Sequence, residues 1–274
     1  MNSDDRLIAR ISDRLKYQGG VAGVVLGGSR ARATHNADSD YDVGVYYSGA
    51  DALDLPALAS AAQDLDDEHR GDLIAPPGAW GNWVNGGGWL VVDGKHVDII
   101  LRDVDRVGQA VEDCRAGRVS AHYQTGHPHA YINAMYAGEL AIARVLAETD
   151  GRLGALKAKT LPYPEALREA ILNTFVFEMG FSLMLAQANI GKEDCYYVAA
   201  HVVRAISCLN QVLFAVNREY CINEKKAVRM IAGFPLKPGN YAGRIHSVIA
   251  TLGTNPTGAC TELEAIITEA RTLQ

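Results

Sequence analysis

A chain of 274 residues with 48% hydrophobic and 21% charged residues has the composition of a globular protein with a sizeable core. Its net charge of −6 and its lack of a Lys/Arg cluster argue against long DNA or RNA as a partner, because their phosphates attract a basic face. The five cysteines are scattered and form no CxxC, which argues against a zinc or disulfide framework. The N-terminus lacks an apolar leader and no run of about 18 apolar residues occurs, so we expect a cytoplasmic protein without a membrane span.

The first part of the chain reads as helices and strands in alternation. An apolar stripe after a Ser N-cap predicts a helix over residues 3–17. Continuous apolar runs predict strands over 21–26 and 41–47. A helix over 55–66 follows, with a proline suited to its first turn. Residues 89–101 predict a hairpin, because two apolar runs flank an Asp-Gly pair.

Residues 76–89 interrupt this pattern with two prolines, several glycines and all three tryptophans of the chain. Two interpretations fit this composition. One is an irregular loop anchored by its aromatic side chains, and the other is a mobile flap whose tryptophans contact a substrate.

After about residue 105 the pattern becomes helical. The predicted helices cover residues 105–115, 130–148, 164–189, 194–218, 223–233, 240–252 and 257–272. Their lengths and short connectors are typical of a helical bundle. We therefore predict an α/β fold, with a small mixed-sheet domain over residues 1–105 followed by an α-helical domain over residues 106–274.

Two carboxylates, Asp40 and Asp42, stand at the start of the second predicted strand. Residues i and i+2 of a strand project to the same face, so two like charges point together, which is tolerable mainly when a cation lies between them. Gly27, Gly28 and Ser29 end the preceding strand and let backbone N–H groups approach an anion closely. The combination predicts a divalent metal beside a phosphate, and a tight turn followed by solvated acids is the alternative.

A third carboxylate, Asp98, interrupts the apolar run VDII of the predicted hairpin. A buried, unpaired acid there would be costly. It is either solvated at a sheet edge or brought beside Asp40 and Asp42, and we favour the second interpretation.

The order strand, GGS, spacer, DSDYD and strand resembles the signature of the nucleotidyltransferase superfamily, which includes DNA polymerase β and the aminoglycoside nucleotidyltransferases. The resemblance implies transfer of a nucleoside monophosphate from an NTP, with ATP favoured, to a hydroxyl of a small molecule, releasing pyrophosphate. It implies that Asp40, Asp42 and Asp98 bind Mg²⁺, with Mn²⁺ as the alternative ion. It also implies that the GGS residues hold the phosphates. Arg32, like Arg30, either adds positive charge there or is simply solvated.

The stretch LNQVLFAVNREYCINEKKAVRMIAGFP is similar to the C-terminal part of the streptomycin/spectinomycin adenylyltransferases. The similarity implies a phosphate contact for Lys225, with Lys226 as the alternative, and an ordinary solvated helix start is equally consistent. Asp98 is the first choice for the general base. Glu139 and Glu178 are the alternatives, because acids in apolar helix surroundings carry raised pKa values unless they are paired.

The acceptor is open to several interpretations. An aminoglycoside- or lincosamide-type antibiotic follows from the resemblance, and an acidic protein suits a cationic acceptor. A toxin-type or regulatory enzyme that modifies tRNA or protein is one alternative, and a non-catalytic nucleotide-binding module is another. A monomer and a homodimer are both compatible with the sequence. Three histidines in one loop resemble a metal cluster by number only, and a structural or substrate-side role is favoured for His122, His127 and His129.

Overall fold

The computed structural model describes residues 3–274 of the chain. By its internal contacts the chain divides into two compact units. The first runs to Glu112 and also takes residues 124–126 and 136–162, and the second holds residues 113–123, 127–135 and 163–274.

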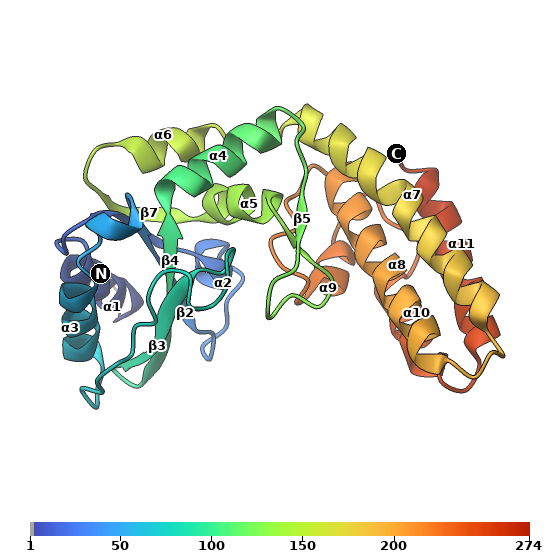
Figure 1. Ribbon diagram of the computed structural model, residues 1–274, viewed down its shortest axis with the longest axis horizontal. Helices are drawn as coiled ribbons and strands as arrows, with labels where there is room; N and C mark the ends of the chain where they lie inside the picture. Colours follow the sequence, from blue (N-terminus) through green and yellow to red (C-terminus); the bar gives the residue numbers. More distant parts are fainter. Residues whose placement is uncertain (1–2) are drawn as a thin grey trace. The chain divides into compact units, whose positions relative to one another are not determined.

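A mixed five-stranded sheet is the framework of the first unit (Figure 1). Its strands are β1 (Val21–Leu26), β2 (Tyr41–Tyr47), β3 (Gly86–Val92), β4 (Lys95–Asp103) and β7 (Arg144–Glu148). They lie in the order β3-β4-β2-β1-β7, in which β2 and β4 are parallel and the other neighbours are antiparallel. A parallel pair needs a crossover connection, and here the connection contains α3 (Leu55–Leu65) and β3.

One face of this sheet carries the hydrophobic core. The amphipathic helix α1 (Ser3–Leu15) packs there beside α3, and Ile11 and Leu58 are buried in one cluster with Val43 and Val45 of β2. Because alternate residues of a strand project to opposite faces, the even-numbered side chains of β2 and β4 point to the second face. That second face holds the carboxylates.

The structure of residues 130–148 differs from the single helix predicted there. The helix expected there, α5 (Ala134–Ile142), ends six residues earlier than predicted, and the chain continues as β7, which pairs antiparallel with β1. The physical reason is the open edge of β1, whose backbone groups need partners that a helix does not supply. Two further helices of this part are α4 (Val104–Arg115), as predicted, and α6 (Arg152–Ala158), which was not predicted. Residues 136–162 therefore pack within the first unit, beyond the boundary predicted at residue 105.

The second unit is helical. It contains a short hairpin of β5 (Ala121–His122) and β6 (Tyr131–Ile132), followed by α7 (Glu165–Asn189), α8 (Cys195–Val216), α9 (Ala227–Ile231), α10 (Tyr241–Thr251) and α11 (Pro256–Arg271). Figure 1 shows α7 and α8 side by side, with α11 against them. The predicted helices after residue 164 are all present, and so the predicted α/β fold with a helical region is confirmed.

By length and composition, α7 and α8 are each apolar enough to cross a membrane. In the structure 67% of the most apolar window of α8 is buried, and 33% of that of α7. Core helices of globular proteins meet the same criterion, so this is weak evidence for a membrane span.

Candidate active site

Two carboxylates lie side by side on the second face of the sheet. The parallel register of β2 and β4 places Asp42 opposite Asp98, and the antiparallel register of β3 and β4 places Trp89 opposite Asp98. Paired positions of neighbouring strands point to the same face, so the two acids and the tryptophan form one row. Both acids are half-buried, whereas Trp89 is exposed.

The GGS turn lies directly against the first of these acids. Gly27 donates its N–H to the carbonyl of Asp42 at 2.7 Å. Gly28 has a φ of +57°, and a Cβ added to it would lie 1.7 Å from Oδ2 of Asp42. Only glycine fits this position, because both the backbone conformation and the close carboxylate exclude a side chain. The turn backbone and the carboxylate therefore share one small space.

Asp40 is exposed and immediately precedes β2. The segment that carries it is fixed by Arg30, whose guanidinium donates to the carbonyls of Ser39 and Asp40 at 2.8 and 3.2 Å. The same group pairs with Asp4 at 2.7 Å and lies 3.6 Å from the ring centre of Tyr41. Arg30 is thus buried and structural, which corrects both interpretations that the sequence allowed for it.

The comparisons with known proteins agree with this geometry. Residues 8–106 match a family model described as a nucleotidyltransferase domain. Residues 8–106 therefore belong to the nucleotidyltransferase superfamily. Residues 134–225 match a second model, a domain of unknown function (DUF4037). Transfer of a nucleoside monophosphate is the reaction type of the first family, whose members use an NTP and divalent metal ions.

One similar solved structure is a nucleotidyltransferase-like protein from Exiguobacterium sibiricum 255-15. The identity is 8%, the match covers 97% of this chain and 74% of that chain, and the TM-score is 0.44. A likeness of this strength adds nothing to the assignment. No curated protein matches the chain.

The remaining predicted phosphate contacts of the nucleotidyltransferase domain lie near the turn or in the other unit. Ser29 and Arg32 are half-buried, on and just after the four-residue helix α2 (Gly28–Ala31). Lys225 belongs to the second unit, where it is exposed and precedes α9. Lys226, the alternative, has a φ of +68° and is the N-cap of α9. A phosphate contact of either lysine stays a prediction.

The tryptophan loop of the nucleotidyltransferase domain is anchored at several points. Trp80 stacks on Trp89 with ring centres 4.6 Å apart. The buried amide of Gln124 accepts from the N–H of Trp83 at 3.0 Å and donates to the carbonyl of Trp80 at 2.6 Å. Tyr136 donates its hydroxyl to the carbonyl of Trp83. These contacts favour the interpretation of an anchored loop over that of a mobile flap.

Glu139, one of the alternative bases, is engaged elsewhere. Its two carboxylate oxygens accept from Nε and Nη2 of Arg102 at 2.8 and 2.9 Å. Arg102 is buried, and it also donates to the carbonyl of Val84 at 2.7 Å. A proton on Glu139 would weaken this pair and leave a buried cation poorly compensated, which argues against Glu139 as the base.

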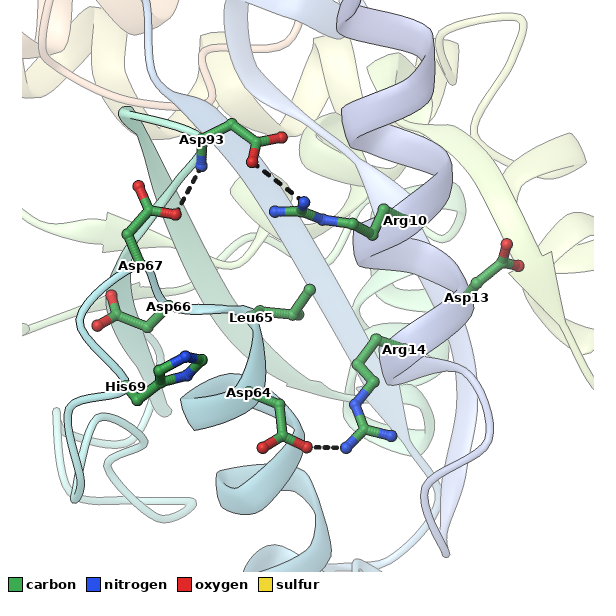
Figure 2. Close-up of a pocket in the computed structure, with 9 residues that line it drawn as sticks. All are labelled: Arg10, Asp13, Arg14, Asp64, Leu65, Asp66, Asp67, His69 and Asp93. Atoms are coloured by element: carbon green, nitrogen blue, oxygen red, sulfur yellow. Dashed lines mark hydrogen bonds and ion pairs between the residues drawn. The ribbon is translucent and has the colours of Figure 1, made fainter.

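A concavity of about 640 Å³ lies between α1, α3 and the turn after β3 (Figure 2). Figure 2 shows that its charges largely satisfy one another, since Arg10 pairs with Asp93 at 3.1 Å and Arg14 pairs with Asp64. Asp67 accepts from the backbone N–H of Asp93 at 2.8 Å. Its lining lies on the α1 and α3 side of the sheet, so this pocket does not contain the row of acids.

The three loop histidines do not share one set of contacts. His122 lies 2.8 Å from the hydroxyl of Ser120, and His127 lies 3.4 Å from Glu224. His129 instead approaches Cys208, with Nε2 4.0 Å from Sγ. No sequence pattern links Cys208 to this loop, because 79 residues separate it from His129.

Proposed function

We propose that this protein transfers a nucleoside monophosphate, with AMP from ATP favoured, to a hydroxyl group of a small molecule. The observation that carries the proposal is the row of Asp42 and Asp98 on neighbouring parallel strands, with the backbone of Gly28 against the Asp42 carboxylate. In the proposed reaction the acceptor oxygen bonds to the α-phosphorus, the bond to the β-phosphate oxygen breaks, and pyrophosphate leaves.

The residues present fit a hard divalent cation. Mg²⁺ prefers carboxylate oxygens and keeps room for phosphate oxygens and water. Asp42 and Asp98 supply adjacent carboxylates, Asp40 supplies a third two residues earlier, and a Cβ at Gly28 would fill the space beside them. When bound, Mg²⁺ or Mn²⁺ would neutralise charge on the triphosphate.

The other groups act on the phosphates and the acceptor. The N–H groups of Gly28 and Ser29, together with the Ser29 hydroxyl, hold phosphate oxygens, because a glycine turn presents several donors to one anion. Arg32 adds positive charge against the triphosphate. Asp98 takes the proton of the acceptor hydroxyl, since Glu139 is committed to Arg102.

The acceptor carries a ring that stacks on an aromatic side chain. Trp89 is 62% exposed, it stands next to Asp98 in the row, and Trp80 supports it from one side. An exposed, braced indole beside the carboxylates suits a sugar or aromatic ring. An aminoglycoside- or lincosamide-type antibiotic has this chemistry, and the net charge of −6 suits a cationic acceptor.

The test is a pyrophosphate-release screen of each NTP against antibiotics, tRNA and proteins, with Mg²⁺ or Mn²⁺. We expect pyrophosphate release that depends on a small-molecule acceptor and is lost in the double variant Asp40→Ala, Asp42→Ala. Release with tRNA or protein would instead identify an enzyme that modifies macromolecules. An unchanged affinity for Mg²⁺-NTP in the double variant would overturn the site.

A further inference from the structure

A cluster of three chemically distinct ligand groups lies in the second unit, apart from the carboxylate row. Its members are His129 from the loop between β5 and β6, Glu178 from α7 and Cys208 from α8. One potential ligand atom of each lies within 4.8 Å of the others. Among residues 3–274, no other His, Cys, Asp or Glu joins this group.

The three side chains are held in place by the fold. α7 and α8 pack against each other along most of their length, which brings Glu178 opposite Cys208. The carboxylate of Glu224 accepts from the backbone N–H groups of His129 and Ala130, at 2.7 and 3.3 Å. This contact fixes the loop so that the imidazole of His129 points at the sulfur of Cys208.

The spacing is close to that of ligands around one ion. Zn–S and Zn–N bonds of about 2.3 and 2.0 Å in a tetrahedron put sulfur and nitrogen roughly 3.5 Å apart. Nε2 of His129 lies 4.0 Å from Sγ of Cys208, so a shift of about half an ångström brings this pair to the spacing of two zinc ligands. The carboxylate of Glu178, within 4.8 Å of both, needs a larger side-chain adjustment. Cys208 is fully buried, whereas Glu178 keeps 22% of its side chain exposed, so an ion can enter from solvent.

We propose that His129, Glu178 and Cys208 bind one Zn²⁺ ion, with a water molecule in the fourth position. A thiolate, an imidazole and a carboxylate together favour zinc over magnesium or calcium, which prefer oxygen ligands only. Three protein ligands with one open position are typical of zinc sites that exchange a ligand, in contrast to closed structural sites with four. The ion would tie the β5–β6 loop to α7 and α8.

The surrounding charges are compatible with this ion. Burial lowers the pKa of His129, so the ring is neutral at pH 7 and has a lone pair to donate. Burial, reinforced by Glu178, raises the pKa of Cys208, so zinc binding releases the thiol proton and weakens as the pH falls. Arg204 pairs with Oε1 of Glu178, and a carboxylate can serve a cation and a metal through separate oxygens.

Metal titration of the reduced, chelator-treated full-length chain tests the site. We expect one tightly bound Zn²⁺ per chain, and with Co²⁺ a thiolate-to-cobalt charge-transfer band and visible bands of a tetrahedral site. Carboxylates alone give no thiolate band, so the nucleotidyl-transfer site does not interfere. Thiocyanate should shift the visible bands by taking the fourth position, and unshifted bands would overturn the open position.

Matched variants identify the ligands. Cys208→Ser should abolish the thiolate band. Glu178→Gln and His129→Gln should each weaken Zn²⁺ binding about 100-fold or more, because the loss of a residue that only hydrogen-bonds to a metal ligand already lowers metal affinity 10- to 100-fold. The exposed Cys195→Ser is the control and should keep the full spectrum.

Should Cys208→Ser fail to fold, the two glutamine variants decide the matter, since their side chains are partly exposed. Zn²⁺ should raise the unfolding midpoint of the wild type but not of these variants. A wild type without the band, or Zn²⁺ affinity unchanged in both glutamine variants, would overturn the proposal. The double variant Asp40→Ala, Asp42→Ala should keep this zinc site, which separates the outcome from that of the proposed function.

Discussion

The substitution Gly28→Ala tests the contact between the glycine turn and the metal-binding carboxylate. The new Cβ would lie 1.7 Å from Oδ2 of Asp42, whereas ordinary contacts lie at 3.4 Å or more. The carboxylate or the turn must therefore move by about 1.7 Å. In addition, alanine at a φ of +57° costs about 1–2 kcal/mol of backbone strain.

Displacement of Asp42 removes charge-assisted contacts that are worth about 1.5–3 kcal/mol. The expected loss of affinity for Mg²⁺ with a non-hydrolysable NTP is therefore about 10- to 100-fold. Calorimetric titration measures it without knowledge of the acceptor. A matched control is Gly94→Ala, because Gly94 has a φ of +68° but nothing within 4 Å of its added Cβ. It should lose similar stability and keep its NTP affinity.

Equal NTP affinities of wild type and Gly28→Ala, measured with the variant folded, would refute the assignment of this turn to the nucleotide site. If Gly28→Ala and Gly94→Ala lost the same amount of NTP affinity, backbone strain alone would explain the effect. Either result would contradict the role given to Asp42.

Three further substitutions test other parts of the account. Asp98→Asn should lower turnover at least 100-fold, because a general base contributes a factor of about 10²–10⁴ to the reaction rate. The affinity for NTP should fall less. Pyrophosphate release at the wild-type rate would exclude Asp98 as the base. Arg30→Lys should lower the free energy of unfolding by about 1.5–3 kcal/mol, since its charged hydrogen bonds to Ser39 and Asp40 are buried, and urea unfolding measures this. Asp66→Asn should flatten the acid side of the stability profile: hydrogen bonding from Arg70 lowers the pKa of the buried Asp66 below its ordinary 3.8, so its stabilisation is present above about pH 4 and is lost as the pH falls further. If the unfolding free energies of the wild type and Asp66→Asn changed equally with pH below pH 4, that role of Asp66 would be contradicted.

The features that could be predicted are those that local pattern encodes. The first strand, the strand after DSDYD and the Asp-Gly hairpin follow from apolar runs and turn residues, and each lies within a few residues of its prediction. The sequence pattern also predicts that Asp98 lies beside Asp42, because a carboxylate in an apolar run needs a partner. The register of β2 and β4 now gives that neighbour.

Long-range partners lie outside what such patterns encode. β7 was predicted as part of a helix because its pairing with β1 joins residues more than a hundred positions apart. The sequence suggests a solvated or phosphate-binding charge for Arg30, since the stretch around it does not show that its side chain turns inward onto Tyr41. The cluster of His129 and Cys208 was missed for the same reason, as no spacing rule connects a loop histidine to a distant helix.

The nucleotide site itself is tested most directly by a crystal structure of the chain with Mn²⁺ and a non-hydrolysable ATP analogue, recorded with anomalous scattering. We expect a manganese peak bound by Asp42 and Asp98, with the triphosphate against the backbone of Gly28 and Ser29. Manganese or triphosphate bound away from this row of carboxylates would contradict it.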